Sequence, residues 1–340
     1  MAKRVFLFFF KFICAGLCAL IILSGFSLFY GYPGIHIENK TGATDYVWLP
    51  NSFHSNSTEG NAYIKTDKNG FNNTKPINKR NKDFNNIDVL LMGSSHMEAF
   101  NVVQTKNTCC LLNEMFVKKN LDLYCYNIGI SGHTFTRCVH NINEAIKEYS
   151  PSKYVIIETM SVLPDEKEMM DILNGKYKKL ESYNSKIMTL LQKIPCFRSI
   201  YKKTLALLEI NADKEDEDKT KASTKPSEYY NDVLNDFLIF AKHSCKSKKL
   251  IIFYHPTLKL QYDGKAFTDT NGVEQFRNAC QNAGITFVDM TDMFLQNYYQ
   301  NHTAPHGFNN TACAVGHLNE YGHRMIAAKL FDTIERSEGK

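Results

Sequence analysis

The sequence carries little net charge and lacks the patterns of several protein classes. Its 340 residues hold 40 Lys and Arg against 35 Asp and Glu, which leaves a formal charge of +5. No RRM, helix-turn-helix or zinc-finger pattern accompanies this slight excess, so nucleic acid is not predicted as a partner. No internal repeat and no Cys-x-x-Cys half-site is present, which argues against a repeat array and the common zinc modules. The length allows one large core or two modest ones.

Charge is also absent from one long stretch, residues 12–32. About twenty apolar residues suffice to cross a bilayer. Basic residues precede the stretch, and the first charge after it is Glu38. This asymmetry predicts an uncleaved anchor over residues 1–35, with the N-terminus in the cytoplasm and the remainder outside. The alternative is a cleaved signal peptide, for which the run is long and followed by no convincing Ala-x-Ala site.

Ten cysteines are present, and eight of them follow the predicted anchor. An even number outside the cytoplasm permits disulfides, but the sequence does not give their pairing. Residues 36–86 are polar and rich in Asn, Gly and Thr. We predict that they form a lead-in that wraps the following domain, with a short strand near residues 63–65.

From residue 87 onward, apolar strand-like runs alternate with helix-like segments. The predicted strands are 89–92, 121–130, 154–159, 250–254 and 286–290, and the predicted helices are 97–118, 137–149, 272–283 and 320–334. This alternation predicts an α/β domain over residues 87–340, a three-layer sandwich around a parallel, flavodoxin-like sheet of five strands.

An insertion at about residues 162–228 interrupts this alternation. Residues 165–210 are dense in Lys, Met and Leu and predict two or three helices, and 211–227 form a charged linker predicted to lack fixed structure. The insertion could act as a lid or a partner-docking element. Alternatively, and with equal weight, the insertion is tolerated at the surface and has no functional role.

Two short motifs could carry chemistry. Gly93-Ser94-Ser95 directly follows the strand at 89–92, which places a small hydroxyl at the carboxyl edge of the sheet, where ligands of α/β folds bind. Gly316-His317-Leu318-Asn319 precedes the last predicted helix. A serine hydroxyl becomes an effective nucleophile when a neighbouring histidine takes its proton.

With a third motif, Asn127-x-Gly129-x-Ser131-Gly132, the chain resembles the SGNH (GDSL-type) hydrolases and acyltransferases. The resemblance implies Ser95 as the nucleophile, with Ser94 in place of the family's aspartate, and His317 as the general base. It also implies an oxyanion hole formed by the backbone N–H groups of Ser95 and Gly132, where one donor typically lowers the barrier by roughly 3 kcal/mol.

The sequence departs from the family at two positions. Ala314 stands where the family has an aspartate three residues before the histidine, and the strand at 154–159 is followed by no asparagine. A Ser–His dyad can still work when a backbone carbonyl orients the imidazole. Asp289 or Asp292, at the end of the fifth strand, is predicted as a substitute acid that orients His317.

Neighbouring residues have structural interpretations. Ser94 is expected to bond turn amides, Asn319 to cap the last helix, and His323 to pack or lie on the surface. The pairs His302/His306 and Cys313/His317 have zinc-ligand spacing. The irregular loop around them and the missing half-site favour no metal, and no cofactor is predicted.

The resemblance and the predicted topology together imply an extracytoplasmic, membrane-anchored ester hydrolase or O-acyltransferase. Its expected substrate is an O-acyl group, most simply acetyl, on a surface or secreted polysaccharide. The expected partners are this acylated glycan, the membrane and a multi-span membrane acyl exporter. The alternative is a non-catalytic glycan-binding or polysaccharide-assembly protein, which Ala314 and the missing asparagine would explain.

Overall fold

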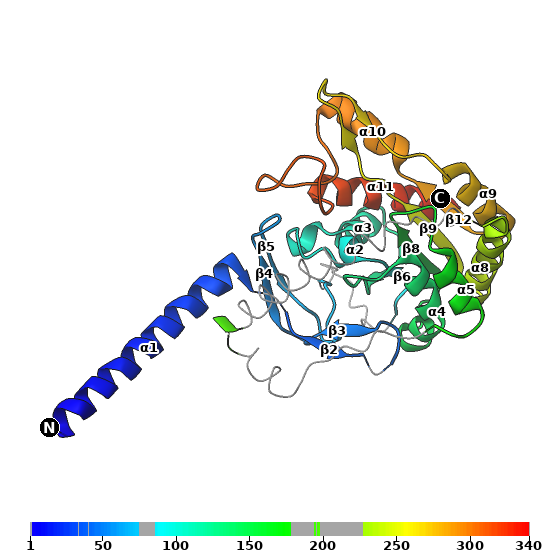
Figure 1. Ribbon diagram of the computed structural model, residues 1–340. Helices are drawn as coiled ribbons and strands as arrows, with labels where there is room; N and C mark the ends of the chain where they lie inside the picture. Colours follow the sequence, from blue (N-terminus) through cyan, green and yellow to red (C-terminus); the bar gives the residue numbers. More distant parts are fainter. Residues whose placement is uncertain are drawn as a thin grey trace.

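The computed structural model describes residues 2–32, 34–39, 41–74, 86–177, 194, 196–197 and 227–339. Most of the predicted insertion at 162–228, including nearly all of its charged linker, lies outside these residues. Within the described part, one α/β domain carries a long N-terminal helix that projects away from it (Figure 1).

A parallel sheet of five strands forms the centre of the domain, in the order β12-β9-β8-β6-β7. The strands are β6 (Val89–Met92), β7 (Cys125–Asn127), β8 (Tyr154–Thr159), β9 (Lys249–Tyr254) and β12 (Thr286–Asp289). Every neighbouring pair is parallel. This order confirms the predicted flavodoxin-like sheet. All residues of β6 and β8 are buried, as expected of central strands covered on both faces.

Successive side chains of the strands enter two separate cores, one on each face of the sheet. Leu90 and Met92 of β6 belong to one apolar cluster, while Val89 and Leu91 belong to the other. Because side chains alternate across a strand, a continuous apolar run serves both faces. The sequence run 89–92 therefore needs no polar residue.

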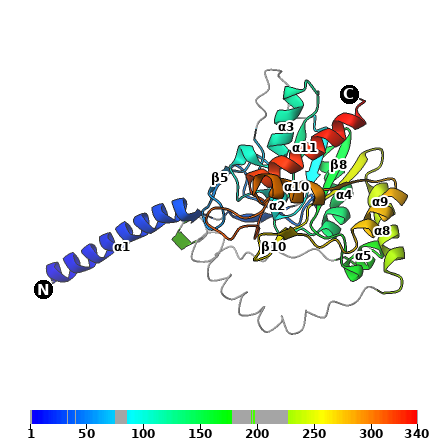
Figure 2. The ribbon, with the colours of Figure 1, turned by 90° about the horizontal axis from the view of Figure 1, so that it is seen from above.

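Helices cover both faces of the sheet (Figures 1 and 2). The first cluster includes residues of α4 (Phe135–Tyr149), α5 (Glu166–Leu173), α8 (Tyr230–Ser244) and α9 (Val273–Asn282). The second includes residues of α3 (Thr108–Lys118), α10 (Thr291–Asn301) and α11 (Glu320–Ser337). The predicted three-layer arrangement is thus confirmed.

The predicted helix at 97–118 is wrong as a single element. The chain forms the short α2 (Ser95–Glu98), which ends at Ala99 with a left-handed φ of 56°, and then η1 (Gln104–Lys106) before α3. Asn107 begins α3 because its side chain accepts the Cys110 N–H, and such a cap competes with continuous helix. The predicted strand at 121–130 is likewise reduced to β7, and α8 and α10 were not predicted.

The lead-in forms small antiparallel sheets beside the domain. β1 (Gly31–Tyr32), β4 (Phe53–Asn56) and β5 (Ala62–Lys65) make one sheet, and β2 (His36–Glu38) pairs with β3 (Tyr46–Trp48). Trp48 and Phe71 are buried in the first core cluster. A further hairpin, β10 (Lys259–Leu260) with β11 (Ala266–Phe267), lies between β9 and α9.

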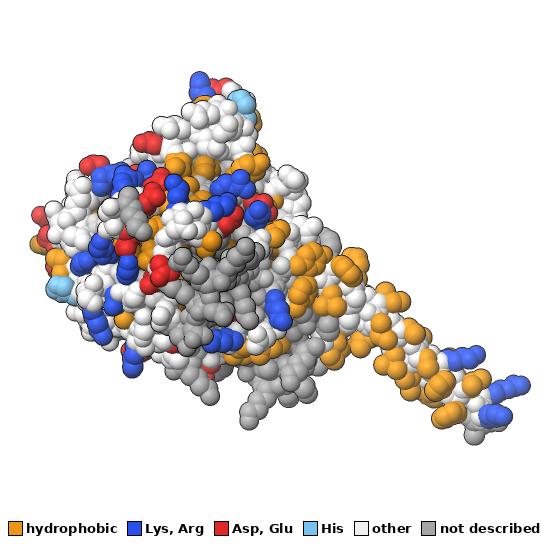
Figure 3. Space-filling model, turned by 180° about the vertical axis from the view of Figure 1, so that it is seen from behind, with side chains coloured by type: hydrophobic (Ala, Val, Ile, Leu, Met, Phe, Trp, Pro, Cys, Tyr) orange, Lys and Arg blue, Asp and Glu red, His pale blue; other side chains and the backbone are white. Residues whose placement is uncertain are grey.

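Helix α1 (Ala2–Tyr30) is long and apolar enough to cross a membrane. Within its span Lys3–Phe29, the most apolar window of 18 residues has a mean hydropathy of 2.6, and none of that window is buried against the domain. Hydrophobic side chains cover its surface, and basic side chains gather at its free end (Figure 3). A signal sequence would have the same length and composition.

Candidate active site

The nucleophile motif forms a tight turn between β6 and α2. A Cβ atom on Gly93 would lie 2.4 Å from Oε2 of Glu158 and 2.6 Å from Cγ of Met97, so only glycine fits. Ser94 caps α2, because its Oγ accepts the N–H of His96 at 3.3 Å. This bond confirms the structural role predicted for Ser94. Ser95 is the first residue of α2 and is half-buried.

The turn places Ser95 against the histidine of the second motif. Oγ of Ser95 lies 2.9 Å from Nε2 of His317, although the two residues are 222 positions apart. His317 lies in the loop before α11. Asn319 caps that helix, as predicted, by accepting the N–H groups of Tyr321 and Gly322. The structure thus brings together the two predicted catalytic residues at hydrogen-bonding distance.

The carboxylate that binds His317 comes from the lead-in. Oε2 of Glu59 lies 2.6 Å from Nδ1 of His317, and its Oε1 accepts the backbone N–H of His317 at 2.5 Å. A carboxylate only accepts, so Nδ1–H donates to Glu59 and Nε2 is left to accept the Ser95 hydroxyl proton. Glu59 therefore supplies what Ala314, buried and without a polar side chain, cannot.

Neither aspartate predicted to orient His317 does so. Oδ2 of Asp289 accepts a bond from Arg277 at 2.7 Å, and its Oδ1 accepts the Thr291 N–H at 2.9 Å. Asp292 is exposed in the first turn of α10. The prediction was wrong because Asp289 ends the edge strand β12 and Asp292 lies in the helix after it. At the edge strand, Asp289 is bound by Arg277 and by the first N–H of α10.

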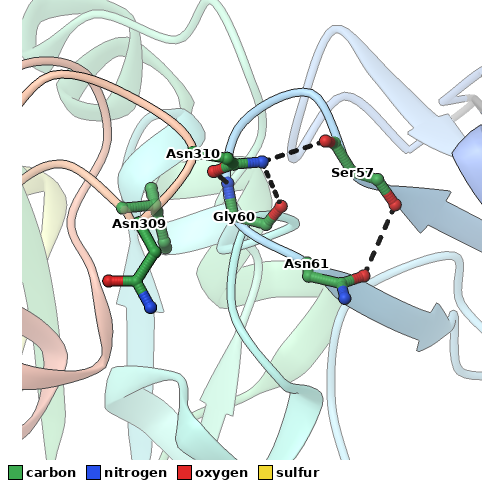
Figure 4. A pocket seen from close by; sticks show the side chains of 6 residues that line it. Ser57, Gly60, Asn61, Asn309 and Asn310 are labelled. Atoms are coloured by element: carbon green, nitrogen blue, oxygen red, sulfur yellow. Dashed lines mark hydrogen bonds between the residues drawn. The ribbon is translucent and has the colours of Figure 1, made fainter.

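The loop that carries Glu59 is held from two sides. Asn310 accepts the N–H of Gly60 at 2.9 Å and donates to the carbonyls of Ser57 and Gly60, both at 3.0 Å (Figure 4). On the other side, Asn101 donates to the carbonyl of Glu59 at 3.1 Å. The Asn310 bonds hold the loop between β4 and β5 against the loop that precedes His317, and the Asn101 bond holds it against the segment after α2.

The same hairpin is bonded to the end of α1. Oγ of Ser55 donates to the Leu28 carbonyl at 2.6 Å, and Oγ of Ser57 donates to the Phe29 carbonyl at 3.1 Å. The last four carbonyls of a helix have no partner within it, so these hydroxyls satisfy two of them. The position of Glu59 is thereby linked to the helix that precedes the domain.

Gly316 allows Glu59 to approach His317 closely. Its φ is +90°, a conformation that favours glycine, and a Cβ atom there would lie 2.1 Å from Oε1 of Glu59. Glycine is therefore needed at position 316 for two reasons: it leaves room for the Glu59 carboxylate and it adopts the left-handed backbone of the turn.

The loop with the third motif lies beside the nucleophile turn. The N–H of Ile130 donates to the Gly93 carbonyl at 3.0 Å. Glu98 accepts the N–H of Ser131 at 3.2 Å and also the indole N–H of Trp48 at 2.6 Å. Gly132 is exposed with a φ of +79°, and no described group accepts its N–H. Its role in an oxyanion hole stays a prediction.

Glu158 lies beneath the nucleophile turn, near the end of β8. Its Oε2 accepts the Ser94 N–H at 2.5 Å, and its Oε1 lies 2.6 Å from Nε2 of His255. Burial by itself raises the pKa of Glu158, but the bond and charge of His255, with the Ser94 N–H, hold that pKa below its ordinary value. The ionised carboxylate thus anchors the turn from below.

A cavity of about 310 Å³ opens next to Ser94 and Glu158. Its walls combine hydroxyl-bearing, acidic and apolar side chains, which are those of Ser94, His133, Thr134, Phe135, Thr136, Glu158, Thr159, Met160, Ser161, Leu163, Pro164, Asp165 and Glu168. It lies at the carboxyl edge of β6 and β8, where α/β folds bind ligands.

The two pairs with zinc-ligand spacing do not form a group of three or more candidate ligands among the described residues. His302 and Cys313 are exposed, while His306 is buried. His306 lies instead with His96 and His255, and one nitrogen atom from each ring lies within 4.8 Å of the other two. This cluster adjoins the ring of His317, whose centroid is 5.0 Å from that of His96.

Sequence reasoning missed Glu59, Glu158 and His255. Glu158 and His255 end adjacent strands, β8 and β9, so their alignment at one sheet edge was available as a signal. Glu59 had no such signal, because nothing in a polar lead-in marks one carboxylate among several.

No family model matches the chain, and no curated protein matches it. Similar solved structures include the psychrotrophic esterase EstA from Pseudoalteromonas sp., with 14% identity over 74% of this chain and 100% of that chain and a TM-score of 0.37. An acetyl xylan esterase, AlAXEase, is 13% identical over 73% of this chain and 100% of that chain, with a TM-score of 0.41. A putative GDSL-like lipase from Parabacteroides merdae is 14% identical over 73% and 95%, with a TM-score of 0.36.

Proposed function

We propose that the chain is a serine-dependent ester hydrolase or O-acyltransferase. The observation that carries the proposal is the array in which Ser95 Oγ lies 2.9 Å from His317 Nε2 and His317 Nδ1 lies 2.6 Å from Glu59. Nucleophile, base and orienting acid within hydrogen-bond reach are the requirement for acyl transfer through serine.

The reaction proceeds in two halves. Ser95 Oγ attacks the ester carbonyl carbon while His317 Nε2 takes the hydroxyl proton, and Glu59 stabilises the imidazolium that forms by accepting the hydrogen bond from its Nδ1–H. The carbonyl oxygen becomes an oxyanion, for which the N–H groups of Ser95 and Gly132 are the proposed donors. Collapse breaks the ester C–O bond, and His317 returns the proton to the leaving alcohol.

The acyl group on Ser95 then passes to a second oxygen. His317 removes a proton from water or from a sugar hydroxyl, which attacks the acyl carbon and releases Ser95. Water gives hydrolysis and a sugar gives transfer, and the two outcomes use the same residues. Measuring free acetate from an acetylated glycan, with and without an added acceptor glycan, separates them: full acetate release despite acceptor means hydrolysis.

The cavity beside Ser94 supports a glycan ester as the substrate. Its volume of about 310 Å³ exceeds what an acetyl group fills, and Thr134, Thr159 and Ser161 line it. Their hydroxyls already donate to protein groups, so they can still accept bonds from sugar hydroxyls. Asp165, whose charge disfavours an anionic group, can accept such bonds as well, whereas Glu168 is paired with Arg137 at 3.4 Å. We therefore propose a neutral saccharide ester, with acetyl as the acyl group.

We also propose that α1 anchors the enzyme and that the domain lies outside the cytoplasm. The apolar span and the basic residues before it support this orientation. Each of the ten cysteines, all of them described, has a free thiol, and Cys313 is exposed. Labelling of Cys313 by a membrane-impermeant maleimide in intact cells, with Cys313→Ser as the control, would support the orientation. Labelling only after lysis would contradict it.

The first test of the activity uses the full chain in detergent and a serine-reactive phosphonate probe. Label should appear on the parent and on Ser94→Ala, and it should be lost in Ser95→Ala and His317→Ala. A folded parent that takes no label would refute the enzyme and favour the glycan-binding alternative. Docking onto a membrane acyl exporter stays a proposal, tested by co-purification from membranes.

A further inference from the structure

The nucleophile turn and the loop that carries His317 before α11, the histidine loop, are joined at two successive residues. Ser95 pairs with His317, and the next residues pair as well: Nδ1 of His96 accepts the backbone N–H of Leu318 at 3.1 Å. His96 and Leu318 are both buried, with 5% and 1% of their surfaces exposed. The second bond is therefore shielded from water, where a lost partner costs most.

We propose that His96 is a positioning residue, whose imidazole binds the Leu318 amide and thereby sets the separation between Ser95 and His317. This inference rests on the proposed function, because it concerns the same reaction. His96 does not touch the reacting atoms. It acts through the backbone that carries the base.

The other hydrogen bonds described below do not connect the histidine loop to α2. Gly307 N–H donates to the His317 carbonyl at 3.0 Å, and Asn319 N–H donates to the Pro305 carbonyl at 3.0 Å, so both fold the loop onto itself. Glu59 ties the loop to the lead-in. The bond from Leu318 to His96 ties it to α2, the element that carries Ser95.

The surroundings of His96 keep its ring an acceptor. Burial, then the neighbouring His255, lower the pKa of His96 to about 2, with His317 and His306 acting in the same direction and Glu158 in the opposite one. A neutral ring has one lone pair. Because that lone pair on Nδ1 faces the Leu318 N–H, Nε2 carries the proton.

The lone pairs of the ring nitrogens also distinguish the His96–Leu318 hydrogen bond, which we call the strap, from a metal site. Nε2 of His255 lies 2.6 Å from Glu158, while its Nδ1 and both ring nitrogens of His306 have no partner among the described residues. The unpartnered ring nitrogens of the cluster therefore lie on His255 and His306, whereas the lone pair of His96 is engaged by Leu318. A cation bound by all three rings would require His96 to release Leu318.

The test compares variants that differ in the acceptor. His96→Ala removes it, whereas His96→Asn restores an oxygen near the position of Nδ1. In the full chain, we expect the rate of phosphonate labelling and kcat to fall about ten- to a hundredfold in His96→Ala, with KM little changed. His96→Asn should recover most of the loss. His323→Asn is the control, since His323 is another buried histidine, bonded to Thr108 and not to the dyad.

The outcomes separate this inference from the proposed function. Equal labelling of the parent and His96→Ala would overturn the strap while the serine enzyme stands, and an unlabelled parent would overturn both. If Ala and Asn variants fold, as judged by fluorescence of the buried Trp48, but are equally impaired, the hydrogen bond is not the cause. Zn²⁺ bound at one equivalent by the parent and lost in both His96→Ala and His306→Ala would replace the strap with a metal site.

Discussion

Glu59 lies 2.6 Å from His317, although 258 positions separate the two residues. The contact joins a loop of the lead-in to the loop before the last helix. The proposed base and its orienting carboxylate therefore come from segments far apart in the sequence, and the lead-in supplies the acid of the proposed Ser–His–acid array.

We expect Glu59→Gln to retain the fold and lose activity. The amide can no longer hold Nδ1–H as an ionised carboxylate does, and loss of the orienting acid lowers kcat by about 10²- to 10⁴-fold in comparable triads. Hydrolysis of a small chromogenic acetate ester measures the effect. The control is Glu38→Gln, which changes a lead-in carboxylate outside the site. Equal loss in both variants would count against a specific role for Glu59.

Gly316→Ala should inactivate the enzyme by displacing Glu59. The added Cβ would lie 2.1 Å from the carboxylate in a backbone with φ of +90°. Gly264→Ala is a matched control, because Gly264 has φ of +81° with nothing within 4 Å of the added atom. Both variants should lose about 1 kcal/mol of unfolding free energy from the left-handed backbone. Only Gly316→Ala should lose ester hydrolysis, and comparable activities in the two would contradict the contact.

Asn310→Ala should loosen the loop that carries Glu59. Three hydrogen bonds are lost, to the N–H of Gly60 and to the carbonyls of Ser57 and Gly60. We expect kcat to fall about tenfold or more because the acid is no longer held in register. Asn309→Ala is the control, because Asn309 is the adjacent residue and lines a surface pocket together with Gly60 and Asn310 (Figure 4). A normal kcat in Asn310→Ala would show that the other contacts of the loop suffice.

Stability should fall as the pH is lowered below about 6.5. Burial is the main cause that lowers the pKa of His96 to about 2 and those of His306 and His323 to about 3. In the unfolded chain these groups titrate near pH 6.5, so the unfolded state binds more protons between pH 6.5 and about 3. The three sites together should cost about 4 kcal/mol of unfolding free energy at pH 5.5.

Urea unfolding at pH 7.5 and 5.5, followed by the fluorescence of Trp48, measures this change. His323→Gln removes one of the three groups and should reduce the difference by about a third. Equal unfolding free energies at the two pH values would show that these rings are not held neutral.

The sequence predicted those parts of the fold and site that local patterns determine. Val89–Met92 and Tyr154–Thr159 were predicted to the residue, because buried parallel strands read as continuous apolar runs between turn signals. Ser95 and His317 each sit where a short motif meets a predicted element, so both could be named in advance.

The failures have different physical causes, and only one of them is packing between distant segments. Glu59 binds His317 only because bonds from Asn101 and Asn310 hold its loop there. The predicted helix at 97–118 is broken by a side-chain cap at Asn107 that apolar periodicity does not register. Asp289 was favoured for its position in sequence, but Arg277 engages it.

The bonds from Ser55 and Ser57 to the end of α1 have a consequence for how this protein can be altered. A leader helix is ordinarily a module that can be exchanged or shortened without regard to the chemistry beyond it. Here an insertion or deletion between the helix and β4 would break the two serine bonds and leave the loop with Glu59 held by Asn101 and Asn310. An exchanged leader would therefore have to present carbonyl groups at the same places to keep this support.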